Sequence, residues 1–140
     1  MATKILVAVD LEDACLTEKM LRIAGEIASQ HDAKVTLIHV AAKLSADVAL
    51  HLPDDFQQRM SVELTSKLKE LADSMKLPPE ATQVHVRHGS IYREILAQAE
   101  ADEADLIVIG CHKPDAADFL LGSNSAKVSQ HATCSVFMVR

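Results

Sequence analysis

Five short runs of apolar residues recur along the chain, and each has the length of a buried β-strand. Four of them are nearly continuous in apolar, largely β-branched residues, which is typical of strands buried on both faces of a parallel sheet. These four runs span residues 4–10, 34–40, 105–110 and 134–140. The remaining run, residues 82–88, is more polar and predicts a strand at the edge of the sheet.

Between these runs the apolar residues recur every three or four positions, the period of an amphipathic helix that covers a sheet. The first such segment has an apolar stripe made of Leu16, Met20, Ala24 and Ile27, with Leu21 and Ala28 beside it. The second carries Phe56, Met60, Leu64, Leu68, Leu71 and Met75, and the pair Pro78-Pro79 stops it soon after Lys76. A third helix follows the cap Ser90 and carries Ile91, Ile95 and Ala99, and a shorter fourth covers about residues 124–131.

Strands and helices therefore alternate, and this order predicts a three-layer α/β fold with a doubly wound, five-stranded parallel sheet. The strand orders 2-1-3-4-5 and 3-2-1-4-5 both fit the pattern. No linker interrupts residues 1–140, so we expect a single domain. Residues 41–54 are too apolar for a free linker, and we expect an ordered excursion that covers the end of the sheet or a partner.

The composition narrows the functions that this domain can have. Of the 140 residues 49% are hydrophobic but only 3% are aromatic, so platforms for stacking bases or a flavin are scarce. The formal net charge is -6, with 14 basic and 20 acidic residues and no basic cluster, which argues against a nucleic-acid partner. No apolar run is long enough to cross a bilayer, so no membrane partner is expected.

The cysteines and the first residues favour a cytoplasmic location. Cys15, Cys111 and Cys134 are odd in number, lack a C-x-x-C spacing and lie in or beside apolar runs, as expected of small buried thiols in a reducing compartment. The beginning of the sequence shows no signal-peptide pattern. We therefore expect the protein in the cytoplasm.

Open α/β sheets bind ligands outside the carboxyl ends of their strands, where the winding reverses. The strongest local pattern at these ends is residues 110–125, in which Gly110 ends a buried strand and Gly122, Ser123 and Ser125 begin a helix. Glycine permits close approach of a phosphate, and the free N–H groups of a helix start favour an anion. From spacing alone the structural alternative weighs equally: Gly110 makes a tight turn and Ser123 caps the helix.

Three other chemical candidates carry less weight. Asp10, at the end of the first strand, can hold a ribose hydroxyl or a metal on the phosphates, or it can simply begin the following helix. His85 and His88 lie three residues apart on a strand and point to opposite faces, so they are not expected to share a metal. Cys111 lies beside His112, but no orienting acid or oxyanion donor can be identified, and an inert thiol is the better interpretation.

Several motifs in a fixed order give a resemblance to a known family. ILVAVD opens the chain, LIHV lies on the second strand, DLIVIG precedes a polar loop, and LLGSNSAKV and a terminal C-x-V-x-x-V-R follow. With these motifs the whole chain resembles a universal stress protein, and the loop HKPDAADFLLGSN is similar to that of the F/G-type bacterial members. The resemblance implies a fold like that of the adenine nucleotide alpha hydrolases, with strand order 3-2-1-4-5.

The resemblance also implies an ATP site, with or without Mg²⁺. Ala8, Val9 and Asp10 would lie beside adenine and ribose, Val40 would contact adenine through its backbone, and Ile109 and Gly110 would form a wall. The implied triphosphate cradle consists of Gly122, Ser123, Asn124 and Ser125, with His112 and Lys113 in the loop before it.

The loop after Gly110 departs from the pattern of the nucleotide-binding members, which is G-x2-G-x9-G-[ST]. Lys113 replaces the second glycine, and eight residues rather than nine separate it from Gly122. The lysine can hinder a phosphate, or its charge can bind a phosphate oxygen. Since the F/G-type members have a similar short loop with a basic residue, ATP binding is the favoured interpretation, and a solvated surface lysine is the alternative.

Two functions from different classes follow. In the first, the chain binds ATP and acts in the stress response through nucleotide-dependent conformation or partner choice. It is then not expected to be an enzyme beyond slow ATP hydrolysis, since no Walker motif and no placed general base is visible. In the second, the chain has lost ATP and works as a dimeric interaction module. A phospho-receiver or a flavin protein fits less well, because His88 follows the third strand where a receiver needs aspartate.

The last strand, residues 134–140, predicts self-association. It is apolar on both faces and would leave an unprotected sheet edge, which a two-fold mate can pair. We expect a homodimer through this strand, with tetramers left open. The alternative is an edge that is short enough to be tolerated and is covered by the chain's own helices.

Overall fold

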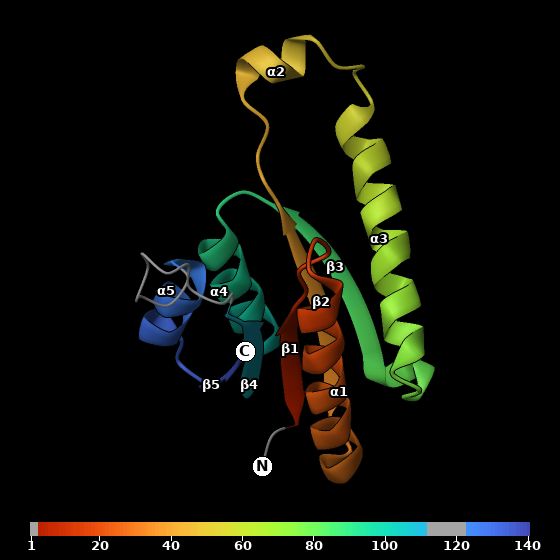
Figure 1. The fold of residues 1–140 in the computed structure, drawn as a ribbon, viewed down its shortest axis with the longest axis vertical. Helices are drawn as coiled ribbons and strands as arrows, with labels where there is room; N and C mark the ends of the chain where they lie inside the picture. Colours follow the sequence, from red (N-terminus) through yellow and green to blue (C-terminus); the bar gives the residue numbers. More distant parts are fainter. Residues whose placement is uncertain (1–2, 112–122) are drawn as a thin grey trace.

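The computed structural model describes residues 3–111 and 123–140 and shows strands and helices in alternation (Figure 1). The strands are β1 (Lys4–Ala8), β2 (Lys34–Ala41), β3 (Thr82–His88), β4 (Leu106–Gly110) and β5 (Ser135–Val139). The helices are α1 (Ala14–His31), α2 (Ala46–Leu50), α3 (Phe56–Ser74), α4 (Ile91–Asp102) and α5 (Ser123–His131), with a 3-10 turn at Pro79–Ala81. Each predicted element is present with slightly shifted ends, and α2 is additional. No helix in the described ranges is long and apolar enough to cross a membrane.

The five strands form one sheet in the order β3-β2-β1-β4-β5, and every pairing is parallel. This confirms the doubly wound sheet and selects 3-2-1-4-5 from the two predicted orders. β3 lies at an edge, as its polar composition predicts. The winding reverses between β1 and β4, because the chain first builds outward through β2 and β3 and then continues on the other side with β4 and β5.

Two apolar clusters fill the space between the sheet and its helical layers. One joins α1 and α3 to the sheet and includes Met20, Leu37 and Leu68. The other joins α4 and α5 to the opposite face and includes Ile95 and Val128. The predicted stripes of α1 and α3 supply the first cluster. Strands β1 and β4 are almost entirely apolar because helices cover both faces of the sheet.

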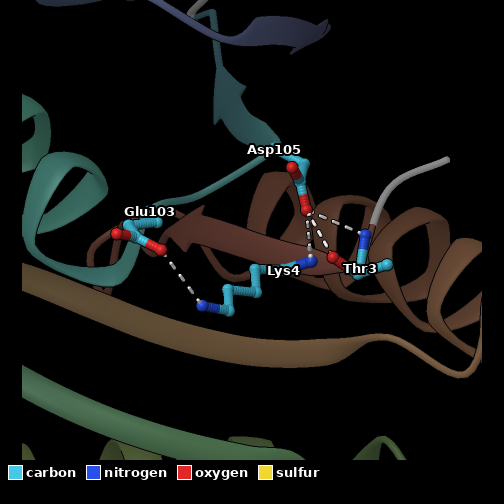
Figure 2. A network of polar contacts seen from close by, with 4 residues as sticks. All are labelled: Thr3, Lys4, Glu103 and Asp105. Carbon is cyan, nitrogen blue, oxygen red and sulfur yellow. Dashed lines mark hydrogen bonds and ion pairs between the residues drawn. The ribbon is translucent and has the colours of Figure 1, made fainter.

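At the amino ends of the strands, Asp105 ties the start of β1 to the start of β4 (Figure 2). Its Oδ2 accepts hydrogen bonds from the Thr3 hydroxyl at 2.7 Å and from the N–H groups of Thr3 and Lys4 at 3.0 and 2.9 Å. The Thr3 hydroxyl and these N–H groups hold the pKa of Asp105 below its ordinary value. Lys4 Nζ also lies 3.8 Å from Glu103 Oε2. A fixed polar cluster therefore closes this end of the sheet.

Residues 41–54 form the expected ordered excursion, but they do not lie over the end of the sheet; the other alternative, that they cover a partner, stays a prediction. The segment projects past the carboxyl ends of the strands, with α2 at its tip (Figure 1). No residue of α2 is buried, and Leu50 is 82% exposed. One reason is the length of α3: its 19 residues span about 28 Å, whereas the seven residues of β3 on which it packs span about 23 Å. Its first turns extend beyond the sheet, so the connection from β2 has to reach outward to meet them.

One of the three cysteines also differs from expectation. Cys15 is exposed, since it lies at the start of α1 on the side away from its buried neighbour Leu16. Cys111 is buried as predicted. Cys134 is half-buried, and this burial raises the pKa of its thiol. All three are free thiols.

Candidate functional site

A cleft of about 850 Å³ lies at the carboxyl ends of β1, β2 and β4, where the winding of the sheet reverses. Strand ends form its floor, and residues of both helical layers form its walls. The cleft brings together eight residues that were predicted for the site, namely Ala8, Val9, Asp10, Val40, Ile109, Gly110, Asn124 and Ser125. Segments that are far apart in the sequence therefore meet at the place that the topology predicts for a ligand.

A groove of similar size, about 920 Å³, runs between α1 and α3 and meets the cleft only at Asp10 and Leu11. Its remaining lining comes from side chains of the two helices, such as Leu21, Glu26 and Met75. No residue of a β-strand lines this groove, and its only contact with a helix start is Ala14 of α1, among the described residues. We therefore place the candidate site in the cleft at the strand ends, where backbone groups are available to a ligand.

The backbone of Val40 faces the cleft because β2 is longer than β1. The last paired residues of β1 and β2 are Ala8 and Ile38, whereas β2 continues beside β3 as far as Ala41. Val9 N–H donates to Ile38 O at 2.8 Å, and Gly89 N–H donates to Ala41 O at 3.1 Å. Residues of a parallel strand bond alternately to the two neighbouring strands, so the N–H and C=O of Val40 point to the side that β1 has left. This geometry agrees with the predicted backbone contact.

His39 also lines the cleft, and the sequence interpretation missed it. Its Nδ1 lies 3.2 Å from the backbone oxygen of Val9. The ring thus bridges β2 to the turn that follows β1. The signal was present in the motif LIHV, since a polar residue inside a buried strand needs a hydrogen-bond partner.

Asp10 organises the turn between β1 and α1. Its Oδ1 accepts a hydrogen bond from Glu12 N–H at 2.9 Å, and its backbone oxygen accepts one from the Thr17 hydroxyl at 2.6 Å. The N-cap of α1 is Asp13, whose carboxylate accepts from Leu16 N–H at 3.0 Å. Asp10 therefore has a structural role before the helix and at the same time lines the cleft. The two interpretations of this residue are compatible.

Gly110 is required by the packing of α1 as well as by the cleft that it lines. A Cβ at this position would lie 2.5 Å from Leu16 Cδ2 and 2.8 Å from Leu16 Cγ. Real side chains do not approach so closely, so Leu16 would have to move. The glycine lets α1 lie close to the end of β4. This packing role differs from the two roles predicted for Gly110, a close approach to phosphate and a tight turn.

The first residues of α5 form one end of the cleft. Asn124 and Ser125 contribute to the lining, and Ser125 is buried. Ser123 is the first residue of this nine-residue helix, whose start carries the positive end of the helix dipole. His112, Lys113 and Gly122, which the resemblance also implies, lie outside the described residues.

The opposite wall of the cleft is α3, a second feature that the sequence interpretation missed. Met60, Leu64 and Lys67 line it, at the four- and three-residue spacing of one helix face. Lys67 Nζ lies 3.8 Å from Glu63 Oε1, and both side chains are largely exposed. Among the described lining residues Lys67 is the sole lysine or arginine, and the carboxylates Asp10 and Glu12 line the same cleft. The apolar stripe predicted Met60 and Leu64 as core residues, but only the fold shows that this face continues to the site.

The two histidines of β3 are not metal partners. His88 Nε2 lies 3.5 Å from the Ser61 hydroxyl of α3, while Arg87, the next residue, donates to Glu94 Oε2 and Gln98 Oε1 of α4 at 2.6 and 2.9 Å. Odd and even positions of β3 therefore face different layers, and His85 shares its face with Arg87. Within the described ranges no group of three or more potential metal ligands exists.

Tyr92 of α4 follows the cleft residue Ile91 in the sequence, and two cationic side chains lie close to it. Arg93 Nε donates to its hydroxyl at 2.9 Å, and Lys127 Nζ lies 4.7 Å from its ring centre. The hydrogen bond from Arg93 lowers the pKa of the Tyr92 phenol, with the charges of Arg93 and Lys127 acting in the same direction. Tyr92, Arg93 and Lys127 are not among the residues that line the cleft, so this cationic group lies next to the site rather than in it.

Known proteins match this chain over almost its whole length, both in sequence and in fold. The chain is 33% identical to universal stress protein G of Salmonella typhimurium over 140 residues, which covers 97% of each sequence. Its fold is similar to that of universal stress protein UspA from Lactobacillus plantarum, with a TM-score of 0.80 and 22% identity over 99% of this chain and 98% of that one.

Two further similar structures are adenine nucleotide complexes. One is a universal stress protein in complex with cAMP, with a TM-score of 0.73 and 19% identity over 99% of this chain and 97% of that one. The other is the universal stress protein from Archaeoglobus fulgidus in complex with dAMP, with a TM-score of 0.66 and 21% identity over 99% and 98%. The sequence profile of the universal stress protein family matches residues 1–140. With a full-length match in sequence and the same sheet order, the chain belongs to the universal stress protein family.

Proposed function

We propose that this universal stress protein binds ATP in the cleft at the carboxyl ends of β1, β2 and β4. The observation that carries the proposal is the convergence of eight predicted nucleotide-site residues on one cleft at the winding reversal. Related folds that hold cAMP and dAMP support an adenine nucleotide as the ligand class. ATP itself, with or without Mg²⁺, is our specific assignment.

In this proposal the two helical layers have different tasks. The backbone of Val40 and the residues Ala8 to Asp10 hold adenine and ribose at the floor of the cleft. The start of α5, with Asn124 and Ser125, binds the phosphates through N–H groups, hydroxyl and amide groups and the helix dipole. Ile109 and Gly110 separate the two regions and leave room for the ribose.

The role of bound ATP is regulatory in our proposal. The nucleotide changes the conformation of the chain, or its choice of partner, during a stress response. Differential affinity of ATP for two conformations is sufficient for this, since a ligand shifts an equilibrium by its preference for one state. Turnover is not needed, and we assign no catalytic residue.

Titration calorimetry with MgATP tests the proposal directly. We expect saturable heat for the unchanged chain and strongly reduced affinity for Gly122→Val, which would place a branched side chain in the implied phosphate cradle. A folding control by circular dichroism accompanies the variant. No heat at millimolar ATP, or equal affinity for the variant, would remove the proposal.

A second candidate function is that of an interaction module without ATP. The observation that favours it is the projecting α2 segment, whose Leu50 is 82% exposed. This function predicts a purified protein that carries no adenine and gives no heat with ATP. An absorbance ratio that shows copurified nucleotide would exclude it.

We also propose that the protein is a cytoplasmic homodimer that pairs through residues 134–140. β5 is the outer strand of the sheet on the β4 side, and Phe137 on this strand is 42% exposed. An exposed apolar edge strand favours pairing with a second copy. Light scattering coupled to chromatography tests this: we expect the mass of a dimer or a tetramer for the unchanged chain and a monomer for Phe137→Lys.

A further inference from the structure

The segment between β2 and α3, residues 42–55 with α2 at its tip, is called the arm here. It is the most exposed apolar part of the described chain: Leu50 is 82% and Val48 47% exposed, and α2 buries no residue. Figure 1 shows the arm standing beyond the carboxyl ends of the strands, on the side of the sheet where the cleft opens. Apolar side chains held so far from the core are costly unless they meet another surface.

The arm begins in the cleft and ends near it. Ala41 and Ala42 line the cleft where the arm leaves β2, and Met60 lines it shortly after the arm joins α3. A ligand in the cleft therefore touches the chain immediately before and shortly after the arm.

Local hydrogen bonds alone hold the arm together. Ser45 caps α2 by accepting from Val48 N–H, Ala49 N–H donates to Ser45 O, and Phe56 N–H donates to Pro53 O at 3.0 Å. At its base, the Asp55 carboxylate accepts from Arg59 Nε at 2.6 Å, within the same helical turn. Within the described ranges, no hydrogen bond joins residues 43–54 to the sheet or to α1, α4 or α5. A segment with few buried contacts and only local bonds opens and closes at low cost in free energy.

We propose that the arm is a lid that closes over the nucleotide, with Val48 and Leu50 covering the base. This inference rests on the proposed ATP site: closure of the arm is the conformational change that ATP binding would cause. Without a ligand, closure would place these side chains over a cavity filled with water and gain little. With a base in the cleft, closure removes two apolar surfaces from water at once, so nucleotide and closed lid stabilise one another.

A single tryptophan tests the lid, because the natural chain contains none. Leu50→Trp places the reporter on α2, and Val62→Trp is the matched control, since Val62 is 66% exposed on α3 and does not line the cleft. On addition of MgATP we expect the emission of the Leu50→Trp chain to shift to shorter wavelength and to become less accessible to iodide. The emission of the Val62→Trp chain should stay unchanged. Calorimetry on the same two variants establishes saturation.

A second pair of variants measures the contribution of the lid to binding. Leu50→Asp should weaken ATP affinity several-fold by placing a charge in the closed interface, whereas Val62→Asp should leave it unchanged. Binding heat without any emission shift at Leu50→Trp would overturn the lid and leave the ATP site intact. Absence of heat for the unchanged chain would overturn both. An emission shift that depends on protein concentration without ATP would show that a second copy covers Leu50, and this too would overturn the lid.

Discussion

The imidazole of His39 donates from Nδ1 to the backbone oxygen of Val9, at 3.2 Å. Since a carbonyl oxygen can only accept, Nδ1 carries the proton of this hydrogen bond. The bond engages the carbonyl of Val9 at the point where β1 leaves the sheet and so fixes the turn toward Asp10. It joins the two strand ends that form the floor of the cleft.

Replacement of His39 by leucine tests this bridge. His39→Leu should lower the free energy of unfolding by about 1 kcal/mol, because the Val9 carbonyl loses its partner. ATP affinity should fall in parallel, since the floor of the cleft becomes less fixed. Urea unfolding measures the first effect and calorimetry the second. His85→Leu on the exposed face of β3 is the control, and equal stability of the two variants would contradict the bridge.

The contact between Gly110 and Leu16 gives a double-mutant test. Gly110→Ala should destabilise the fold by about 1–3 kcal/mol, because the new Cβ would lie 2.5 Å from Leu16 Cδ2. Adding Leu16→Ala should remove this clash, so the double variant loses less stability than the sum of the two single variants. Thermal and urea unfolding provide the measurements.

Gly25→Ala is the matched control for this test. A Cβ at position 25 would lie 3.8 Å from Met75 Cε, an ordinary contact, within the helix α1. This substitution should stabilise the fold by about 0.5–1 kcal/mol through the higher helix propensity of alanine. Two results together would show that the close contact with Leu16 does not cause the loss of stability in Gly110→Ala. One is that Gly25→Ala also destabilises the fold, and the other is that the effects of Gly110→Ala and Leu16→Ala on the free energy of unfolding simply add.

Lys67 should contribute to the binding of anionic ligands. In Lys67→Met the charged residues left in the described lining of the cleft are the acids Asp10 and Glu12. ATP affinity should therefore fall about two- to fivefold, which is the size of effect expected for one exposed charge. The affinity for adenosine should not change. Lys69→Met, which lies outside the cleft, is the control. A loss that persists at high salt, or that affects adenosine equally, would contradict a charge effect.

The Asp105 cluster predicts a pH dependence of stability. Its hydrogen bonds lower the pKa of Asp105 in the folded chain, so they stabilise the fold at pH values above the ordinary aspartate pKa of about 3.9. This stabilisation is lost as the pH falls through the lower folded pKa. Asp105→Asn should therefore unfold at lower urea concentration than the natural chain at pH 7, and the difference should shrink toward pH 3. Glu70→Gln, at an exposed position of α3, should show no such trend.

The period of the apolar residues predicted the alternating elements and the doubly wound parallel sheet, but it left two strand orders open. Buried runs such as residues 105–110 can only be strands covered on both faces, and the stripe through Met20 and Ala24 can only be a helix on a sheet. The polar edge strand followed from the same pattern. The direction of the arm could not be predicted, because it depends on how far α3 extends past β3.

The sequence predicted the cleft residues that lie at strand ends. It did not predict the cleft residues that are brought there by packing between the sheet and its helices. Val40 and Gly110 lie at strand ends, where the topology predicts a ligand, whereas Ile109 was implied by the family resemblance. His39 and Lys67 belong to the cleft because β1 ends early and because α3 crosses one wall. Neither circumstance is visible in a local window of sequence. Gly110 lines the cleft, but its close packing against Leu16 could not be predicted, because it depends on the position of the folded helix α1.

The early end of β1 has a consequence for base choice. β2 continues to Ala41 with the N–H and C=O of Val40 directed at a strand that is no longer there, so the sheet presents one donor and one acceptor side by side. The Hoogsteen edge of adenine carries the matching pair, the N6 donor and the N7 acceptor, whereas guanine offers two acceptors at the same place. A base that binds here makes the hydrogen bonds that a further residue of β1 would have made. Its identity is then selected by main-chain atoms alone. ATP should bind about tenfold more tightly than GTP, and substitution of Val40 by isoleucine should leave this preference unchanged.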